Sequence, residues 1–322
     1  MNRESAFHSR LAATMEEFVA GKRMQGYDYT DQARKLSYFD RFLAMEGLHG
    51  DAGCLCRETL QRYVATTGHL GPQSRHTRIA SLREFSRWLQ ARCPGSAVLP
   101  GDILPRCRDS ERFFPITPSQ VAALMAAATL LLRRDPMRAR SIATLIGLLY
   151  ACGLRIAEAL NLTLRDLAPD GSTVHVRRGK FGKERLVPLS RSTHAALSEY
   201  LAVHRRHAHR AETSALFIAA GGAALNCGQV YHDFQRLCRH CGLRGKPAPR
   251  LHDLRHNYAC RRLALWRQQG RDINALLPVL ATAMGHVNFF ATQRYLHLDA
   301  AALQDAAARF HNHVLSQSES RP

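Results

Sequence analysis

Residues 252–256 read HDLRH, residues 284–288 read MGHVN and residues 292–299 read TQRYLHLD. His252 and Arg255 stand three positions apart, so on a helix they share one face and can reach one pocket. The second and third segments add another imidazole, His286, and a phenol, Tyr295. Side chains of these kinds can neutralise charge, transfer protons and supply a nucleophile. The three segments therefore indicate a catalytic site in this part of the chain.

Two segments nearer the N-terminus carry residues of the same chemical kind. Residues 151–162 (ACGLRIAEALNL) contain Arg155, and residues 177–190 (RRGKFGKERLVPLS) contain Lys180. Strand-like stretches at residues 173–176 and 185–188 are joined by a glycine-containing turn at 179–182, which is typical of a β-hairpin. A lysine on such a turn is a candidate general acid. Glu158 is expected to orient Arg155 through an ion pair.

Taken together and in this order, the five segments resemble those of the tyrosine recombinases, the family of phage and transposon integrases. The resemblance covers nearly the whole chain. It implies site-specific recombination, in which DNA is cut and rejoined through a covalent 3′-phosphotyrosine intermediate. It implies that Lys180 is the general acid and Tyr295 the nucleophile. The residues it places around the scissile phosphate are Arg155, His252, Arg255 and His286.

These implied roles agree with the chemistry of the residues. A tyrosine that stays attached to the cut strand keeps the bond energy for rejoining. Arginines clamp nonbridging phosphate oxygens bidentately and stay charged. No carboxylate cluster suits a two-metal nuclease, and no second pair matches Cys238 and Cys241 at zinc-site spacing. We therefore expect no metal and no cofactor.

The expected fold class is mainly α, in two domains. Residues 1–105 are predicted to form an N-terminal helical core-binding (SAM-like) bundle, and residues 106–112 a linker in a stretch rich in proline. Residues 113–322 are predicted to form a mixed α/β, mostly helical catalytic domain with a small β-sheet, a C-terminal helix and a tail. The helices of the first domain are expected over residues 11–20, 30–46, 58–66 and 73–92.

The charge of the chain indicates a polyanionic partner. Among 322 residues, 45 Lys+Arg oppose 26 Asp+Glu, for a net charge of +19. Residues 1–111 hold 16 and 13 of these, so residues 112–322 hold the remaining 29 and 13, a net of +16. We expect the partner to be double-stranded DNA. Arg75 and Arg78, which begin a helix, are candidate DNA contacts, with a solvated helix face as the alternative.

The resemblance also predicts how the protein assembles. We expect inverted core half-sites and a homotetramer on two DNA sites, held by a C-terminal helix over about 300–314 that docks on a neighbouring subunit. Accessory DNA-bending or directionality proteins are optional partners. The gap of 31 residues from Arg255 to His286 is similar to that in some transposon-encoded members, which favours a mobile-element origin.

The apolar runs, the N-terminal residues and the cysteines of the sequence indicate where in the cell the protein acts. No apolar run reaches the length of a membrane span, and the first residues, MNRESAFHSR, have no apolar signal core. We expect no membrane partner and a cytoplasmic, nucleoid-associated protein. Nine cysteines in a long chain do not read as a disulfide framework, so reduced thiols are expected.

Three other functions remain open on the sequence. The first is a catalytically silent DNA-binding relative, and the second a type IB topoisomerase-like strand relaxase. The third is a metal-dependent nuclease that uses the histidines. His256, which follows Arg255, is interpreted as a packing residue or a neighbour of the catalytic group rather than a catalytic residue.

Overall fold

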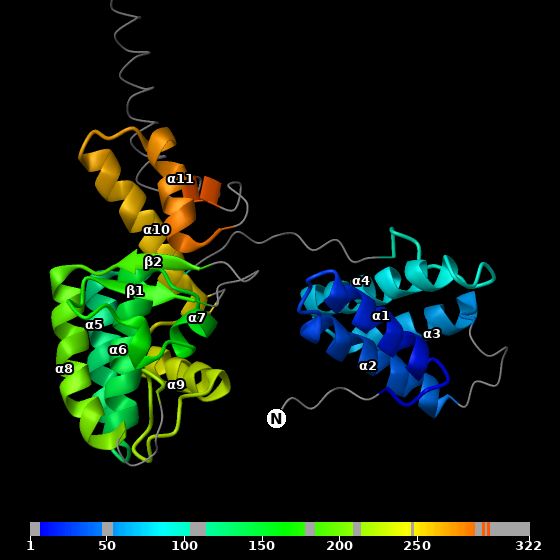
Figure 1. Ribbon diagram of the computed structural model, residues 1–322, viewed down its shortest axis with the longest axis horizontal. Coiled ribbons are helices and arrows are strands. Elements are labelled where there is room, and N and C mark those ends of the chain that lie inside the picture. Colours follow the sequence, from blue (N-terminus) through cyan, green and yellow to red (C-terminus); the bar gives the residue numbers. More distant parts are fainter. Residues whose placement is uncertain are drawn as a thin grey trace, which may run out of the picture. The chain divides into compact units, whose positions relative to one another are not determined.

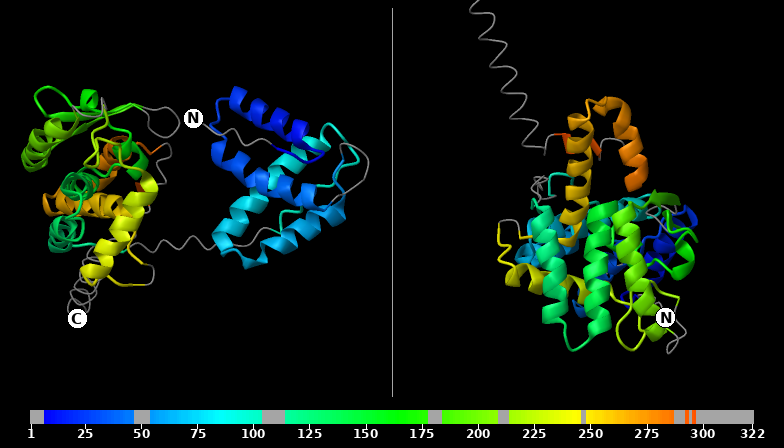
Figure 2. Two further views of the ribbon diagram at one scale, coloured as in Figure 1. Left: turned by 90° about the horizontal axis from the view of Figure 1, so that it is seen from below. Right: turned by 90° about the vertical axis from the view of Figure 1, so that its left-hand side faces the viewer.

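The structure is a computed structural model that places the chain in two compact units, residues 1–110 and 111–322. Figure 1 and Figure 2 show the elements of each unit. The residues that the structure describes are 7–46, 54–103, 114–177, 184–208, 214–245, 248–286, 292–293 and 295–296.

The first unit is a bundle of helices around one apolar core. Ile79, Leu82, Phe85 and Leu89 line the buried face of its last helix, as the helical spacing predicted. Phe18, on the first helix, lies edge-on to the Phe85 ring, so aromatic contacts join the two helices. The elements are α1 (Ala12–Met24), α2 (Thr30–Met45), α3 (Arg57–Thr66), the short helix η1 (Thr67–His69) and α4 (Pro72–Gln90).

A buried carboxylate fixes the start of this bundle. Asp40 on α2 accepts the backbone N–H groups of His8 at 2.7 Å and Ser9 at 2.9 Å. These amides precede α1 and have no partner within that helix, so the carboxylate replaces the water they would otherwise bind. The chain before α1 is thereby tied to α2.

One pair of cysteines contradicts the expectation of reduced thiols. Cys54, before α3, and Cys93, after α4, form a disulfide bond. The two segments lie side by side because the Ala97 amide donates to the Leu55 carbonyl at 2.7 Å. Cysteine spacing along the chain does not reveal this neighbourhood, which forms only when α3 and α4 pack.

The second unit is mostly helical. Its α5, α6 and α8 run side by side, and α6 also packs on α10 (Figure 1). Thr117 begins α5 with a capping box, in which its hydroxyl accepts the Gln120 amide and the Gln120 side chain accepts the Thr117 amide. The helices are α5 (Pro118–Leu131), α6 (Pro136–Cys152), α7 (Ile156–Leu160), η2 (Leu164–Asp166), α8 (Arg191–Ala208), α9 (Cys227–His240), α10 (Leu251–Gln268) and α11 (Ile273–Met284).

A two-stranded antiparallel hairpin lies in this unit. Strand β1 (Thr173–Val176) pairs with β2 (Arg185–Pro188), and Val174 stands opposite Val187. Both valines are buried in the core of the unit, so the register is fixed by the apolar face. The sequence predicted both strands. Residues 178–183, where the sequence predicts a turn that carries Lys180, lie outside the described residues.

Helices α10 and α11 form a pair that extends from the rest of the unit (Figures 1 and 2). Leu263 on α10 packs with Leu277 and Leu280 on α11 in a small cluster that also includes Tyr295. Residues 264–278 form the end of α10, the connection and the start of α11. Tyr295 therefore packs with side chains from both helices of the pair.

The expected fold class, mainly helical with a small sheet, is confirmed. No helix in the part of the chain that the structure describes is both long and apolar enough to cross a membrane. The linker predicted at 106–112 and the C-terminal helix predicted at 300–314 lie outside the described residues.

Gly153 should be indispensable for the stability of the second unit. It ends α6 with φ +65°, and a Cβ there would lie 2.3 Å from Cδ1 of Tyr258. We expect Gly153→Ala to lower the free energy of unfolding by about 3 kcal/mol, from left-handed strain and overpacking together. Gly242→Ala is the matched control, because that glycine has φ +70° and open space around its Cβ position. Equal losses in urea unfolding of the two variants would contradict the packing argument.

Candidate active site

The HDLRH segment forms the first turn of α10. Asp253, fully buried, accepts the Arg250 amide at 2.7 Å and its guanidinium at 2.9 Å, which caps the helix start. This cap fixes the turn on which His252 and Arg255 stand. The aspartate of the motif therefore positions the catalytic candidates rather than acting on substrate.

Arg155 lies in the short connection between α6 and α7. The chain leaves α6 at Gly153 and begins α7 one residue after Arg155, whose backbone N–H donates to Oε2 of Glu158 at 3.0 Å. Its Nη1 donates to Oε1 of the same carboxylate at 2.6 Å. This is the ion pair that the sequence analysis expected, and Glu158 is only 3% exposed.

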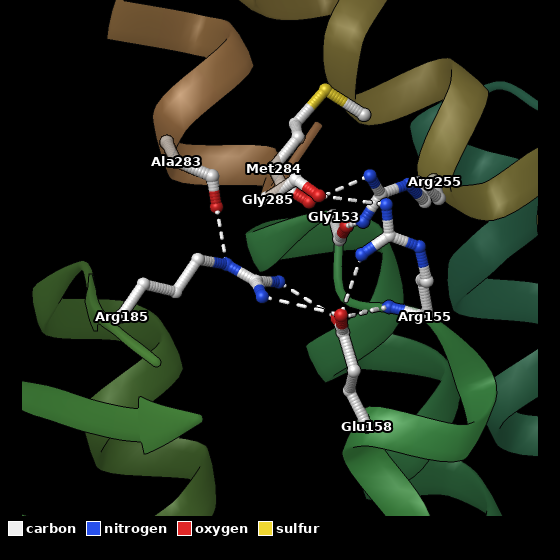
Figure 3. A network of polar contacts seen from close by, with 8 residues as sticks. All are labelled: Gly153, Arg155, Glu158, Arg185, Arg255, Ala283, Met284 and Gly285. Carbon is white, nitrogen blue, oxygen red and sulfur yellow. Dashed lines mark hydrogen bonds and ion pairs between the residues drawn. The ribbon is translucent and has the colours of Figure 1, made fainter. Parts of the chain in front are cut away.

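Three guanidinium groups meet the last carbonyls of α11 (Figure 3). Arg185 donates to the Ala283 carbonyl at 2.9 Å, Arg255 to Met284 at 2.7 Å and Arg155 to Gly285 at 2.8 Å. Carbonyls at the end of a helix lack intrahelical partners and carry partial negative charge. The three arginines, from β2, α10 and the start of α7, thus satisfy the end of α11 immediately before His286.

The pocket holds more positive than negative charge. Among its described residues, the guanidinium groups of Arg155, Arg185 and Arg255 surround one carboxylate, that of Glu158. Burial and the neighbouring Arg155 lower the pKa of Arg255 to about 10, so it stays protonated at pH 7. Arg255 is 1% exposed and also donates to the Gly153 carbonyl at 2.6 Å. A second anion would reduce the excess charge, which is +2 for three guanidinium groups and one carboxylate.

Burial alone would raise the pKa of Glu158. Hydrogen bonds and charge from Arg185 and Arg155 outweigh that effect and lower this pKa to about 2. The carboxylate is therefore ionised throughout the physiological range, and it holds both arginines in place.

Tyr295 belongs to the same cluster of side chains and is 1% exposed. Its hydroxyl is 3.1 Å from Nδ1 of His256, and its ring stacks at 6.2 Å on that of His286. His286 Nδ1 is 2.7 Å from the hydroxyl of Thr292. The phenol is thus enclosed by two imidazoles and lies near enough to Arg255 to interact with its charge.

His252 stands at the edge of this group, with its ring 4.5 Å from that of His256. Desolvation, with the charges of Arg255 and Arg250, lowers the pKa of His252 to about 4. Its side chain retains access to solvent. At pH 7 His252 is therefore neutral, and it can donate one hydrogen bond and accept another.

The structure brings together most of the catalytic residues that the sequence singled out. Lys180 lies outside the described residues. Arg75 and Arg78 belong to the first unit, where Arg75 donates to the Thr67 hydroxyl at 3.3 Å and Arg78 stacks on the Tyr38 ring at 3.9 Å. The five residues gathered in the second unit are Arg155, His252, Arg255, His286 and Tyr295.

Sequence reasoning missed one member of the site. Arg185 lies in the quoted hairpin segment but received no role, and its contacts were not foreseeable from spacing. His256 was interpreted as a packing residue or a neighbour of the catalytic group, and its contact with the Tyr295 hydroxyl agrees with the second of these interpretations. The one available signal for His256 was its position one turn after His252 on the same helix.

Within the described ranges, no three His, Cys, Asp or Glu side chains gather as metal ligands would. The polar groups of the pocket are guanidinium, imidazole and phenol groups with one carboxylate. This set is suited to binding a phosphate diester, because cations and neutral hydrogen-bond donors surround a buried phenol.

The fold and the site together describe one kind of protein, a mostly helical unit in which arginine and histidine side chains gather around a buried tyrosine. The profile of the phage integrase family matches residues 115–302. The chain belongs to this family, the tyrosine recombinases.

Relatives and solved structures agree with this assignment. The integrase/recombinase y4rB of Sinorhizobium fredii is 32% identical over 94% of this chain and 97% of its own. The tyrosine recombinase XerC of Rhizobium meliloti is 30% identical, over 94% and 91%. Two solved structures share the fold. XerH bound to palindromic difH in a post-cleavage complex has a TM-score of 0.62, at 18% identity over 87% and 79% of the two chains. The Tn1549 transposon integrase with transposon right end DNA has a TM-score of 0.60, at 16% identity over 91% and 99%.

The depressed pKa of Glu158 predicts acid sensitivity of the second unit. The group contributes stability that is present above its unfolded pKa, 4.5, and is lost as the pH falls toward its folded value of about 2. At pH 7 this contribution is about 3 kcal/mol. We expect Glu158→Gln to lose that much at pH 7, and the gap from the unaltered protein to shrink to roughly half or less at pH 3.

Urea unfolding at the two pH values measures the gap. Asp170→Asn is the control, because the pKa of Asp170 is also lowered, by hydrogen bonds from Ser172, but this carboxylate is fully exposed. A deficit in Glu158→Gln that does not change with pH would show that the ion pairs are not its source.

Proposed function

We propose that the protein is a site-specific DNA recombinase that cuts and rejoins DNA through a covalent 3′-phosphotyrosine. The observation that carries the proposal is the buried Tyr295 hydroxyl in a pocket with excess positive charge. Membership of the tyrosine recombinases supports it. A phosphate diester bound here adds one negative charge, which reduces the excess positive charge, and lies beside the phenol.

The reaction uses groups of this chain. The Tyr295 oxygen attacks the scissile phosphorus and passes its proton to Nδ1 of His256, 3.1 Å away, while the bond from phosphorus to the 5′-oxygen breaks. Lys180 protonates the leaving 5′-oxygen. Arg155 and Arg255 neutralise the charge on the nonbridging oxygens of the transition state, while His252 and His286 donate hydrogen bonds to them. Attack by a 5′-hydroxyl on the phosphotyrosine reverses the steps and joins the strand.

Recombination places these steps on two DNA molecules. We propose that the protein binds double-stranded DNA at inverted core half-sites, acts as a homotetramer on two sites, and is encoded by a mobile element. The net charge of +16 on residues 112–322 supports DNA binding through phosphates. One structural neighbour is an integrase solved with transposon end DNA. Accessory DNA-bending or directionality proteins are optional, and the location is cytoplasmic and nucleoid-associated.

The first unit presents a basic face for the same duplex. Arg78 on α4 and Arg41 on α2 both stack on the Tyr38 ring, with guanidinium carbons 3.9 and 4.7 Å from its centroid. The ring holds two cations close together on the bundle surface. We propose that Arg75 and Arg78 contact DNA phosphates from this face, with Arg41 beside them.

Two alternatives share the fold. A catalytically silent relative would bind DNA without attaching to it, and a type IB topoisomerase-like relaxase would attach and reseal without joining partner strands. The gathered site argues against the first, because a silent protein has no need of a tyrosine held against two imidazoles. Joining of partner strands after covalent attachment separates a recombinase from the second.

Tyr295→Phe should abolish covalent attachment. The change deletes one oxygen and leaves the ring, so DNA binding should stay within about twofold. A nicked suicide DNA releases a short fragment with the 5′-hydroxyl on cleavage, so the strand cannot be rejoined. The covalent adduct of the unaltered protein is thereby trapped, and a denaturing gel resolves it. Tyr258→Phe is the matched control, since it removes a phenol oxygen from α10 in the same unit. Trapping by Tyr295→Phe at the normal rate would refute the assignment.

The same assay tests metal independence. We expect the adduct to form at an unchanged rate in EDTA, because arginines neutralise the phosphate charge. Complete loss of cleavage on chelation, with recovery on adding Mg²⁺ or Zn²⁺, would instead support a metal-dependent nuclease.

Removing the residues after Asp299 should separate DNA binding from assembly. The deleted segment contains Leu303, Ala307, Phe310 and Val314, spaced as one apolar helix face. We expect the truncated protein to bind one half-site with unchanged affinity, to form no complex of two DNA sites, and to cleave slowly. Native gels and light scattering report the complexes. Normal recombination by the truncated protein would rule out this role of the segment.

A further inference from the structure

We infer that Arg185 is a positioning residue for the strand-cutting reaction, acting through Arg155 and the chain before His286. The inference rests on the proposed function, because it concerns how that reaction gathers positive charge at the phosphate. Arg185 begins β2 and is 8% exposed. Its guanidinium therefore lies inside the unit and acts through the groups it contacts there.

The contacts of Arg185 join three elements. Nη2 donates to Oε2 of Glu158 at 2.7 Å and Nη1 to Oε1 at 3.2 Å, while Nε donates to the Ala283 carbonyl at 2.9 Å (Figure 3). One planar group thus links β2 to α7 and to the end of α11. A lysine has a single ammonium group, so it cannot reproduce this spread of donors in one plane.

Arg185 sets the position of Arg155 through a shared carboxylate. Each oxygen of Glu158 accepts from both arginines, with Nη1 of Arg155 at 2.6 Å and its backbone N–H at 3.0 Å. Because Arg185 occupies the other side of both oxygens, Arg155 bonds Glu158 with one terminal nitrogen and places the other on the Gly285 carbonyl. Without Arg185, the Glu158 carboxylate is free to rotate toward Arg155, which would change the orientation of the Arg155 guanidinium group.

A glycine next to the histidine provides independent support. Gly285 has φ +65°, and a Cβ there would lie 2.7 Å from Nη1 of Arg185 and 3.4 Å from Nη1 of Arg155. The backbone at the end of α11 therefore lies directly against both guanidinium groups. The residue after this glycine is His286, so a shift of either arginine also moves the segment that leads to the histidine.

A folding role alone does not require this arrangement. The Glu158 carboxylate could be buried with one arginine as its partner, as Asp233 is with Arg138 in the same unit. Here a second cation, the buried Arg185 side chain, adds repulsion to the partly exposed Arg155, which costs stability unless an anion arrives. The extra charge is therefore better explained by the phosphate that the pocket is proposed to bind.

The test compares two substrates that differ in charge. The first is the nicked suicide DNA with its normal phosphodiester, and the second carries a methylphosphonate at the scissile position, which replaces a charged oxygen by a methyl group. On the phosphodiester we expect Arg185→Gln to attach covalently about 10- to 100-fold more slowly, with half-site binding within about twofold. On the neutral methylphosphonate that defect should shrink by about tenfold or more, because less charge needs neutralising.

Two further variants isolate the effect. Arg177→Gln is the matched control, because Arg177, which directly follows β1, pairs with the buried Asp166 but has a side chain that is 54% exposed. It should cleave both substrates at normal rates. Arg185→Lys keeps the charge without the spread of donors, and should show an intermediate defect on the phosphodiester. Thermal unfolding shows whether each variant is folded. If Arg185→Gln is not, Arg185→Lys takes its place in the comparison of the two substrates.

The outcomes separate the inference from the proposed function. No adduct with the unaltered protein would overturn the proposed function and the inference with it. Normal attachment by the unaltered protein, with equal defects of the Arg185 variants on both substrates, would overturn the inference alone and leave Arg185 a folding residue. Unchanged cleavage by these variants would do the same. A defect that shrinks on the neutral substrate supports the positioning role.

Discussion

The carboxylate of Glu158 holds the centre of the second unit together. It is buried, and Arg155 and Arg185 donate to both of its oxygens. A buried charge is stable only with partners of opposite charge, so the three elements that carry these groups must meet at one place. The end of α11 completes the arrangement, because its carbonyls accept from the arginines and bring His286 to the same pocket.

This arrangement prepares the pocket for an anion before one binds. The guanidinium groups have fixed partners among backbone carbonyls and Glu158, so little reorganisation is needed when a phosphate enters. Tyr295 is held against His256 and stacked on His286. The stability of the unit and the proposed chemistry therefore depend on the same contacts, and changes at Glu158 should affect both.

The sequence predicted the parts of this structure that depend on local pattern. The helical spacing of Ile79 and Phe85, the strands of the hairpin and the common face of His252 and Arg255 all follow from residues close in the chain. It did not predict contacts between distant segments. Arg255 meets Met284 and Cys54 meets Cys93 only after helices pack, and no periodicity records that. Arg185 was missed because an arginine on a short strand is usually a solvated residue.

Mass spectrometry of the trapped complex tests the central claim most directly. After suicide DNA is trapped, nuclease and protease digestion leaves a peptide that carries a short nucleotide remnant. The account predicts a 3′-linked phosphate on Tyr295, within the segment 290–299. A remnant on Tyr258 or on a serine would contradict it, and so would cut DNA that carries free ends with no protein attached.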